Sequence, residues 1–177
     1  QYAVKQGRKK VTCVHKANIM KLSDGLFRDV FYEVSREFPQ IEAEDKIVDN
    51  VAMQMVMRPQ QFDVVVTENL YGDILSDLTS GLIGGLGLLP SSNLGNGYAM
   101  FEAVHGSAPD IAGKGIANPT AFLWSACMML EHMGNLETAA RIRRAVDAVL
   151  AEGRTLTPDL GGNATTLEYC DQIIKRL

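Results

Sequence analysis

Residues 62–80, FDVVVTENLYGDILSDLTS, decide the fold because they join a strand pattern to a helix pattern. The short β-branched run from Phe62 to Val66 is typical of a buried parallel strand. A turn is predicted at Glu68 and Asn69, and apolar residues then recur at helical spacing from Tyr71 onward. This change of period predicts one strand–helix step of an α/β fold.

Asp73 and Asp77 lie four residues apart at the start of that predicted helix, so both carboxylates project from one face. Like charges at this spacing destabilise a helix by about 0.2–0.5 kcal/mol, so the pair needs an explanation. One explanation is a bound Mg²⁺ or Mn²⁺, since these ions suit carboxylate oxygens. The other is that both acids favour a helix N-terminus and face water. Spacing alone favours the second.

The composition limits the classes of partner. A length of 177 residues suits one domain or two small lobes, and a hydrophobic content of 46% is ordinary for a globular protein. The net charge of −4 gives no footprint for nucleic acid, and no apolar run has spanning length, so neither nucleic acid nor membrane is expected as a partner. The cysteines are widely spaced without a CxxC motif, which indicates reduced thiols in an intracellular protein.

Strand and helix patterns alternate along the rest of the chain. Strands are predicted at residues 10–15, 41–43 and 98–104. Helices are predicted from an N-cap at Ser23 or Asp24 to Phe38, and at residues 49–58, 120–132, 137–152 and 165–176. The glycine-rich residues 81–90 contain neither GxGxxG nor a Walker lysine, which favours a close-packed crossover between lobes over a phosphate loop.

Polar residues gather after the predicted strands, where ligands bind in an open α/β sheet. They are His15, Lys16 and Asn18, then Asn69 and Asp73, then His105. Burial beside a metal could lower the pKa of Lys16 enough for proton transfer, and the alternative is an ordinary surface lysine.

Residues 102–118, EAVHGSAPDIAGKGIAN, are rich in Gly and Ala, so their backbone N–H groups can approach a phosphate or a ring closely. Asp110 could accept hydrogen bonds from both hydroxyls of an adenosine ribose and would repel a 2′-phosphate. A structural Ω-loop is the equal alternative.

Four ordered motifs resemble the β-decarboxylating dehydrogenases, a family that contains isocitrate, 3-isopropylmalate, homoisocitrate and tartrate dehydrogenases. They are VHKANIMKLSDGLF at 14–27, VDN at 48–50, NLYGDILSD at 69–77 and FEAVHGSAPDIAGKGIANP at 101–119. The resemblance covers essentially the whole chain and corresponds to the C-terminal half of a member. It implies a partial, two-lobed α/β fold like that of isopropylmalate dehydrogenase, with no Rossmann fingerprint. Residues 1–82 would form the smaller, dimer-forming lobe, and residues 83–177 would belong to the larger lobe with the cofactor loop.

The resemblance also implies roles for individual residues. Asp73 and Asp77 would hold Mg²⁺ or Mn²⁺, and Asp49 would complete that site from the neighbouring subunit of a homodimer or higher oligomer. Lys16, from the same neighbouring subunit, would act with Asp49 as a catalytic residue and handle the proton of the substrate hydroxyl. Asn18 would lie near substrate and nicotinamide. The adenosine half of the cofactor would contact His105, Gly106, Ser107, Ala108, Pro109, Asp110, Ile111 and Asn118.

The implied reaction is hydride transfer from a small 2-hydroxy acid to a nicotinamide, followed by loss of CO₂. NAD is the expected cofactor, because NADP-using relatives carry a lysine–tyrosine pair where Asp110 and Ile111 stand. Those relatives also carry a tyrosine and an arginine where Pro158 and Gly162 stand. HKANIMK favours isocitrate as substrate, with 3-isopropylmalate and homoisocitrate as alternatives. The family's protonating tyrosine and substrate-binding arginines precede residue 1, so this segment alone is not expected to turn over.

A non-catalytic regulatory subunit is the alternative from a different functional class. Such subunits tend to lose the metal aspartates and the HGSAPD loop, and this sequence keeps both, which favours a catalytic subunit. The predicted helices at 22–38 and 48–58 are expected to contact the neighbouring subunit. The expected compartment is a bacterial cytoplasm or a mitochondrial matrix.

Overall fold

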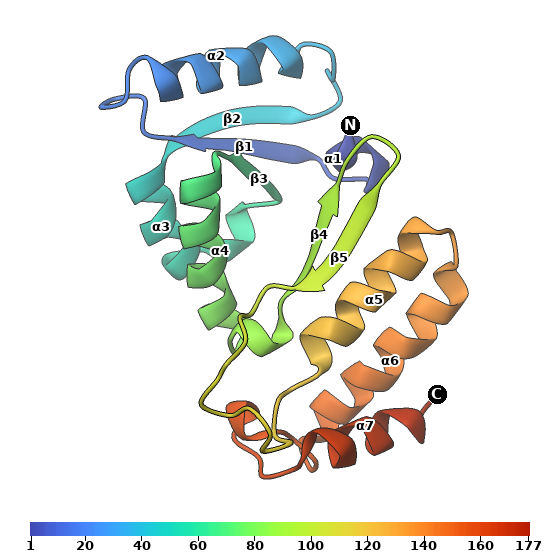
Figure 1. Cartoon of the computed structure of the whole chain (residues 1–177). Coiled ribbons are helices and arrows are strands. Elements are labelled where there is room, and N and C mark those ends of the chain that lie inside the picture. Colours follow the sequence, from blue (N-terminus) through green and yellow to red (C-terminus); the bar gives the residue numbers. More distant parts are fainter. The chain divides into compact units, whose positions relative to one another are not determined.

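The computed structural model describes all 177 residues, which form two compact units, Gln1–Leu82 and Ile83–Leu177 (Figure 1). The first unit contains a three-stranded parallel sheet and the second a two-stranded antiparallel one. Helices accompany both sheets, so the α/β class predicted from the sequence is confirmed. None of these helices combines the length and the apolar character needed to cross a bilayer.

The sheet of the first unit has the strand order β2-β1-β3. Strand β1 spans Lys10–His15, β2 spans Glu42–Ile47 and β3 spans Val64–Thr67. The central strand β1 is buried from Thr12 to His15, as expected for a parallel strand covered on both faces. All three strands run in the same direction, so their carboxyl ends meet at one edge of the sheet.

Helices cover both faces of this sheet. Helix α2 (Ser23–Ser35) connects β1 to β2, α3 (Val48–Met57) connects β2 to β3, and α4 (Asn69–Ile83) follows β3. The first crossover moves to one side of β1 and the second moves back across it, so right-handed connections place α2 and α3 on opposite faces. Figure 1 shows α2 on one face and α3 with α4 on the other. The core on the α3–α4 side is Val14, Val51, Met55 and Leu75.

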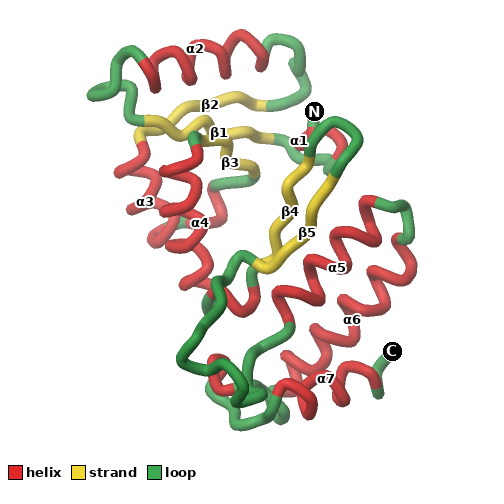
Figure 2. The backbone as a smooth tube through the Cα atoms, in the orientation of Figure 1, coloured by secondary structure: helices red, strands yellow, loops and turns green.

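The second unit is built on a hairpin and three helices. Strands β4 (Pro90–Leu94) and β5 (Ala99–Ala103) form the hairpin, and α5 (Thr120–His132) packs against both. Helix α6 (Leu136–Glu152) lies beside α5, and α7 (Thr166–Ile174) packs on α6. The core contains Ala145, Val146, Val149, Tyr169 and Ile173. The long loop between β5 and α5 carries the predicted cofactor residues (Figure 2).

Several predicted boundaries are wrong. Strand β2 continues to Ile47 instead of ending at residue 43, α2 ends at Ser35, and α4 begins at Asn69 in place of the predicted turn. Strand β4 and the short helix α1 (Tyr2–Lys5) were not predicted. Strand β4 begins with Pro90 and continues through Ser and Asn, residues that are depleted in strands. It tolerates them because it is hydrogen-bonded to β5 on one side only, and an edge strand can accommodate a proline.

Two further predictions need correction. Neither Ser23 nor Asp24 caps α2, because the N-cap residue is Leu22, without a side-chain capping bond. The polar residues that follow the predicted strands do not share one sheet, since β5 pairs only with β4 in the second unit. His105 therefore does not belong to the sheet edge that carries Lys16 and Asn69.

Candidate functional site

Lys16 and Asp49 meet at the carboxyl edge of the parallel sheet. Lys16 directly follows β1, and Asp49 lies in the first turn of α3, just after β2. The Lys16 Nζ atom lies 2.5 Å from Asp49 Oδ2. The connections after β1 and β2 leave toward opposite faces of the sheet. In an open α/β sheet, ligands usually bind outside the carboxyl ends of two strands whose connections diverge in this way.

Asp49 keeps a negative charge at this edge. The hydrogen bond from Lys16, and then the one from the Asn50 amide, hold the pKa of the Asp49 carboxyl below its ordinary value. Its side chain remains 67% exposed, so a cation from solvent or from another chain can reach it. Asn18, two residues beyond Lys16, is exposed as well.

Asp24 holds the backbone beneath Lys16. Its Oδ2 atom accepts a hydrogen bond from the Lys16 amide at 2.7 Å, and Ser23 donates to Oδ1 at 2.9 Å. Asp24 is only 1% exposed, and burial alone would raise the pKa of its carboxyl. The hydrogen bonds from Lys16, Ser23 and Tyr71 outweigh burial and lower that pKa. The sequence pattern predicts a helix cap at Asp24 and gives no sign of this role.

Asp73 and Asp77 lie in the second and third turns of α4, not at its start as predicted. A helix N-terminus therefore does not explain the pair. Both residues are exposed. Their main-chain carbonyls accept hydrogen bonds from Ser76 and Ser80, while neither carboxylate has a hydrogen-bond partner. Two unpartnered carboxylates on one helix face fit an oxygen-coordinated divalent metal such as Mg²⁺ or Mn²⁺.

A metal site is not complete within a single copy of the chain. No group of three His, Cys, Asp or Glu side chains gathers closely enough to hold an ion. Asp49 on α3 and the pair on α4 therefore do not form one ligand set here. The prediction that Asp49 joins the other two across a subunit boundary stays a prediction.

The predicted cofactor residues of the second unit occupy an open loop. His105 to Asp110 are all exposed, and the His105 ring bonds only the neighbouring Gly106 carbonyl, with Nδ1 at 3.1 Å. Ala108 has a φ of 43°, the only positive value at a non-glycine residue. Asp110 has no hydrogen-bond partner. Strain and unpaired polar groups of this kind are typical of ligand-binding loops.

Asn118 differs from the rest of this set because its side chain is buried and hydrogen-bonded through both its nitrogen and its oxygen. Its Nδ2 atom donates to Asp159 Oδ2 at 2.9 Å, and its Oδ1 atom accepts from the Thr120 amide at 3.0 Å. Thr157 completes the network through a 2.6 Å bond to Asp159 Oδ1. The Asn118 side chain thus fixes the end of the loop, and Asp159 and Thr157, which no sequence pattern marked, share this role.

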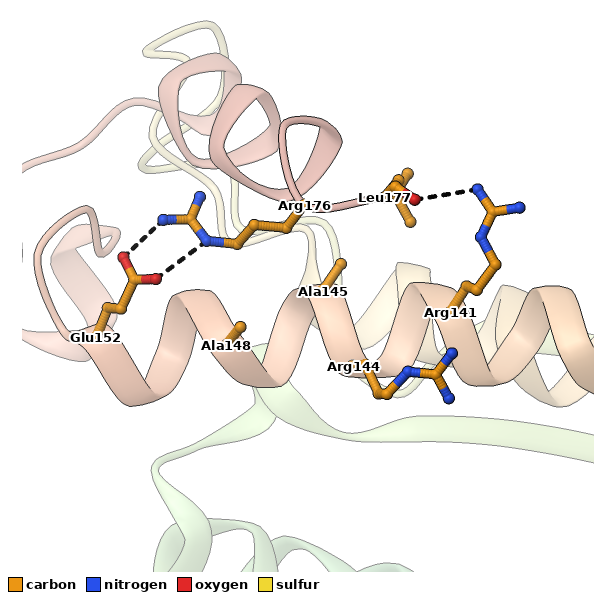
Figure 3. Close-up of a pocket in the computed structure, with 7 residues that line it drawn as sticks. All are labelled: Arg141, Arg144, Ala145, Ala148, Glu152, Arg176 and Leu177. Carbon is orange, nitrogen blue, oxygen red and sulfur yellow. Dashed lines mark hydrogen bonds and ion pairs between the residues drawn. The ribbon is translucent and has the colours of Figure 1, made fainter.

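Two cavities of the structure contain none of the predicted residues. One, of about 440 Å³, lies between α6 and α7, and Figure 3 shows its lining. Two of its three arginines have partners: Arg176 bonds Glu152, with Nη2 at 2.6 Å from Oε2, and Arg141 bonds the Leu177 carbonyl at 3.1 Å, whereas Figure 3 shows no such bond for Arg144. The other, of about 460 Å³, lies along the β4–β5 hairpin.

Comparison with known proteins gives a consistent family. The model of the isocitrate/isopropylmalate dehydrogenase family matches residues 1–176. The chain is 58% identical over its whole length to a mitochondrial regulatory subunit of NAD isocitrate dehydrogenase from Dictyostelium discoideum. It is 58% identical over 96% of its length to the isocitrate/homoisocitrate dehydrogenase of Thermus thermophilus, and 53% identical over its whole length to the 3-isopropylmalate dehydrogenase of Archaeoglobus fulgidus.

Solved structures agree with these relatives. The isocitrate dehydrogenase of Methylococcus capsulatus superposes with a TM-score of 0.95 at 56% identity, covering 99% of this chain and 52% of that one. The chain likewise covers 50% of the Dictyostelium relative, 51% of the Thermus relative and 54% of the Archaeoglobus relative. The chain therefore spans about half the length of the curated relatives it matches.

Proposed function

Because this chain belongs to the isocitrate/isopropylmalate dehydrogenase family, we propose that the full-length protein is an NAD- and divalent-metal-dependent isocitrate dehydrogenase. It would convert isocitrate to 2-oxoglutarate and CO₂. The observation that carries this proposal is the pairing of Lys16 with Asp49 at the carboxyl edge of the parallel sheet. A lysine held beside an exposed carboxylate can remove a hydroxyl proton beside a metal once its ammonium has given a proton to solvent.

Each residue has a distinct part in this proposal. Lys16, once its ammonium has released a proton to solvent, takes the proton of the substrate hydroxyl, and Asp49 holds the lysine side chain at the site before substrate enters. Asp49, Asp73 and Asp77 would hold Mg²⁺ or Mn²⁺, and Asn18 would contact the substrate. When bound, NAD would accept the substrate hydride, and the metal would polarise the resulting carbonyl.

The cofactor would lie on the loop His105, Gly106, Ser107, Ala108, Pro109, Asp110 and Ile111. The exposed Asp110 carboxylate can accept from both ribose hydroxyls and repels a 2′-phosphate, which supports NAD over NADP. Asn118 would act by fixing the loop end through its bond to Asp159.

We also propose that two copies of the chain share each active site, with the first unit as the dimer-forming lobe and the second as the cofactor lobe. The incomplete metal site within one chain supports this arrangement. So do the exposed apolar residues on the helices of the first unit, which are Leu26, Val30 and Val34 on α2, Met53, Val56 and Met57 on α3, and Leu70 and Ile74 on α4. Those on α2 lie on one face of the sheet and those on α3 and α4 on the other, so they form two separate apolar groups.

The test of function is a steady-state assay of the full-length protein with NAD and Mg²⁺ or Mn²⁺. Isocitrate, 3-isopropylmalate, homoisocitrate and tartrate are compared by kcat/KM. The highest kcat/KM for isocitrate supports the proposal. A preference for 3-isopropylmalate or homoisocitrate would leave the proposed residue roles unchanged and replace isocitrate as the substrate.

A regulatory subunit is the second candidate, because the Dictyostelium relative carries that name. Asp73→Asn separates the two candidates, and Asp147→Asn, an exposed acid on α6, is its control. For a catalytic subunit, only Asp73→Asn raises the metal concentration needed for half-maximal activity, by about tenfold or more. No turnover in the parent protein, with ligand responses independent of Asp73, would favour the regulatory candidate.

A bacterial cytoplasm or a mitochondrial matrix is the expected compartment, and the mitochondrial relatives support the latter.

A further inference from the structure

A chain of hydrogen bonds behind Lys16 joins His15, Asp45 and Tyr32. The proposed function assigns no role to these three residues. His15 Nε2 lies 2.8 Å from Asp45 Oδ2, and the Tyr32 hydroxyl donates to Asp45 Oδ1 at 2.5 Å. The three residues come from β1, β2 and α2. His15 is only 3% exposed, whereas the Asp45 side chain is 33% exposed at the edge strand.

The other ring nitrogen of His15 bonds the loop that carries Lys16. The Ala17 amide donates to His15 Nδ1 at 3.0 Å. An N–H donor needs a lone pair on Nδ1, so the ring proton must be on Nε2, where it is donated to Asp45. Asp45 therefore fixes both the tautomer and the orientation of the ring, and the ring fixes the Ala17 amide.

Two consecutive amides of the loop thus have side-chain acceptors on different elements. Asp24 on α2 accepts from the Lys16 amide at 2.7 Å, and His15 on β1 accepts from the Ala17 amide at 3.0 Å. With both peptide planes held, the Lys16 side chain leaves the backbone in a fixed direction. It ends at Asp49, with only 24% of its surface exposed.

Given the proposed function, on which this inference rests, we propose that His15 is a positioning residue that Asp45 orients and that holds the Ala17 amide so that Lys16 points at the reacting hydroxyl. Residues that orient a functional group from behind typically change activity by about 10–100-fold when replaced. A misplacement of about 1 Å can cost about a hundredfold in rate.

Two amide substitutions separate the two bonds of the ring. In His15→Asn, the side-chain oxygen can replace Nδ1 and still accept from Ala17, but it is too short to reach Asp45. In His15→Gln, the amide can reach Asp45 but leaves Ala17 without its acceptor. We expect His15→Gln to lower kcat by about 10–100-fold with KM within about threefold, and His15→Asn to lower kcat less.

Glu44→Gln is the matched control, because Glu44 is the neighbouring carboxylate on β2. It accepts from Thr12 at 2.7 Å and from Lys46 at 2.8 Å, pairs with Lys10 at 3.3 Å, and has no hydrogen bond or ion pair with residues 15–18. It should lower thermal stability without changing kcat. If Glu44→Gln lowered kcat as much as His15→Gln does, the loss in His15→Gln would be explained by general destabilisation of the sheet, and the inference would be overturned.

Two measurements test the inference without turnover. Amide hydrogen exchange at Lys16 and Ala17 should become faster in His15→Gln and stay close to wild type in Glu44→Gln. Nitrogen-15 NMR of the wild-type protein should find His15 protonated on Nε2 and not on Nδ1. The opposite tautomer, or unchanged exchange in a folded His15→Gln protein, would overturn the positioning role. A wild-type enzyme inactive on every 2-hydroxy acid would overturn the proposed function instead, and leave the exchange result to decide the positioning of the loop.

Discussion

Asp24 couples the acid stability of the fold to the backbone that carries Lys16. Its pKa is lowered in the folded chain, so its carboxylate stabilises the fold above its unfolded pKa of about 3.9, and this contribution is lost as the pH falls through the lower folded value. Asp24→Asn should therefore flatten the dependence of the unfolding free energy on pH below about pH 4. Urea denaturation at several pH values measures this slope.

Ser23→Ala is the graded comparison, since it removes only the 2.9 Å bond to Asp24 Oδ1 and leaves the Lys16 amide bonded. It should flatten the slope in part. An unchanged slope in Asp24→Asn would mean that this carboxylate contributes nothing to acid sensitivity.

Single residues differed in how far the sequence could predict them. Lys16 was identified because it ends a clear apolar strand, and Asp73 and Asp77 because like charges at helical spacing are unusual. Local sequence patterns did not bring Lys16 and Asp49 together, because β2 continues through Asp45 and Lys46, charged residues that hide a strand. Only the family resemblance placed both residues in one site. The helix-cap prediction for Asp24 is wrong because an N-cap residue and a buried acceptor for the Lys16 amide have the same local sequence. Only the tertiary fold distinguishes the two roles.

The loop of residues 157–163 has tight backbone packing that agrees with the proposed choice of NAD over NADP. A Cβ atom at Gly162 would lie 2.0 Å from the Leu156 carbonyl oxygen, a backbone atom that cannot turn aside. That carbonyl already accepts from the Ala164 amide at 2.9 Å, and the Gly162 amide donates to Thr157 at 3.1 Å. The family resemblance places an arginine of NADP-using relatives at this position, and the present loop has no room for one.

Gly162→Ala should lower the unfolding free energy by about 1–3 kcal/mol or more, because the loop must move to admit a methyl group. Thermal denaturation measures the loss. Gly106→Ala is the control, since a Cβ there meets no atom within 4 Å and the backbone is not left-handed. Equal stability of the two variants would contradict the close approach of Leu156. A change of preference toward NADP should accordingly begin at Asp110 and Ile111, on the open loop.

At the scale of elements, patterns predicted what is local. The strand Lys10–His15 and helices α5 and α6 follow from apolar periodicity, which depends only on nearby residues. Only strand β5 of the hairpin is predicted from the sequence. Strand β4, from Pro90 to Leu94, gains its strand conformation from pairing with β5 and not from its own propensity. For the same reason the sequence could not tell that β5 pairs with β4 and does not join the parallel sheet.

For the whole molecule, the proposal of an active site shared between two copies can be tested by mixing variants, because Lys16 and Asp49 pair within one chain. Lys16→Ala and Asp73→Asn should each be inactive as homodimers. If Lys16 and Asp73 of each site come from different copies, as proposed, a mixed dimer has one site with both substitutions and one site with neither. Unfolding and refolding an equal mixture should therefore restore about a quarter of wild-type activity, since about half of the dimers are mixed and each has one intact site.

Mixing Lys16→Ala with Asp49→Asn provides the control, because the 2.5 Å ion pair shows that these two residues come from the same chain. In that mixed dimer each site carries one lesion, so no activity should return. Recovery in this control, or none in the Lys16 and Asp73 mixture, would contradict a site built from Lys16 and Asp49 of one copy and Asp73 and Asp77 of the other. Sedimentation equilibrium of each mixture, run beside the assay, must find dimers or larger assemblies, since a monomer at micromolar concentration could not share a site.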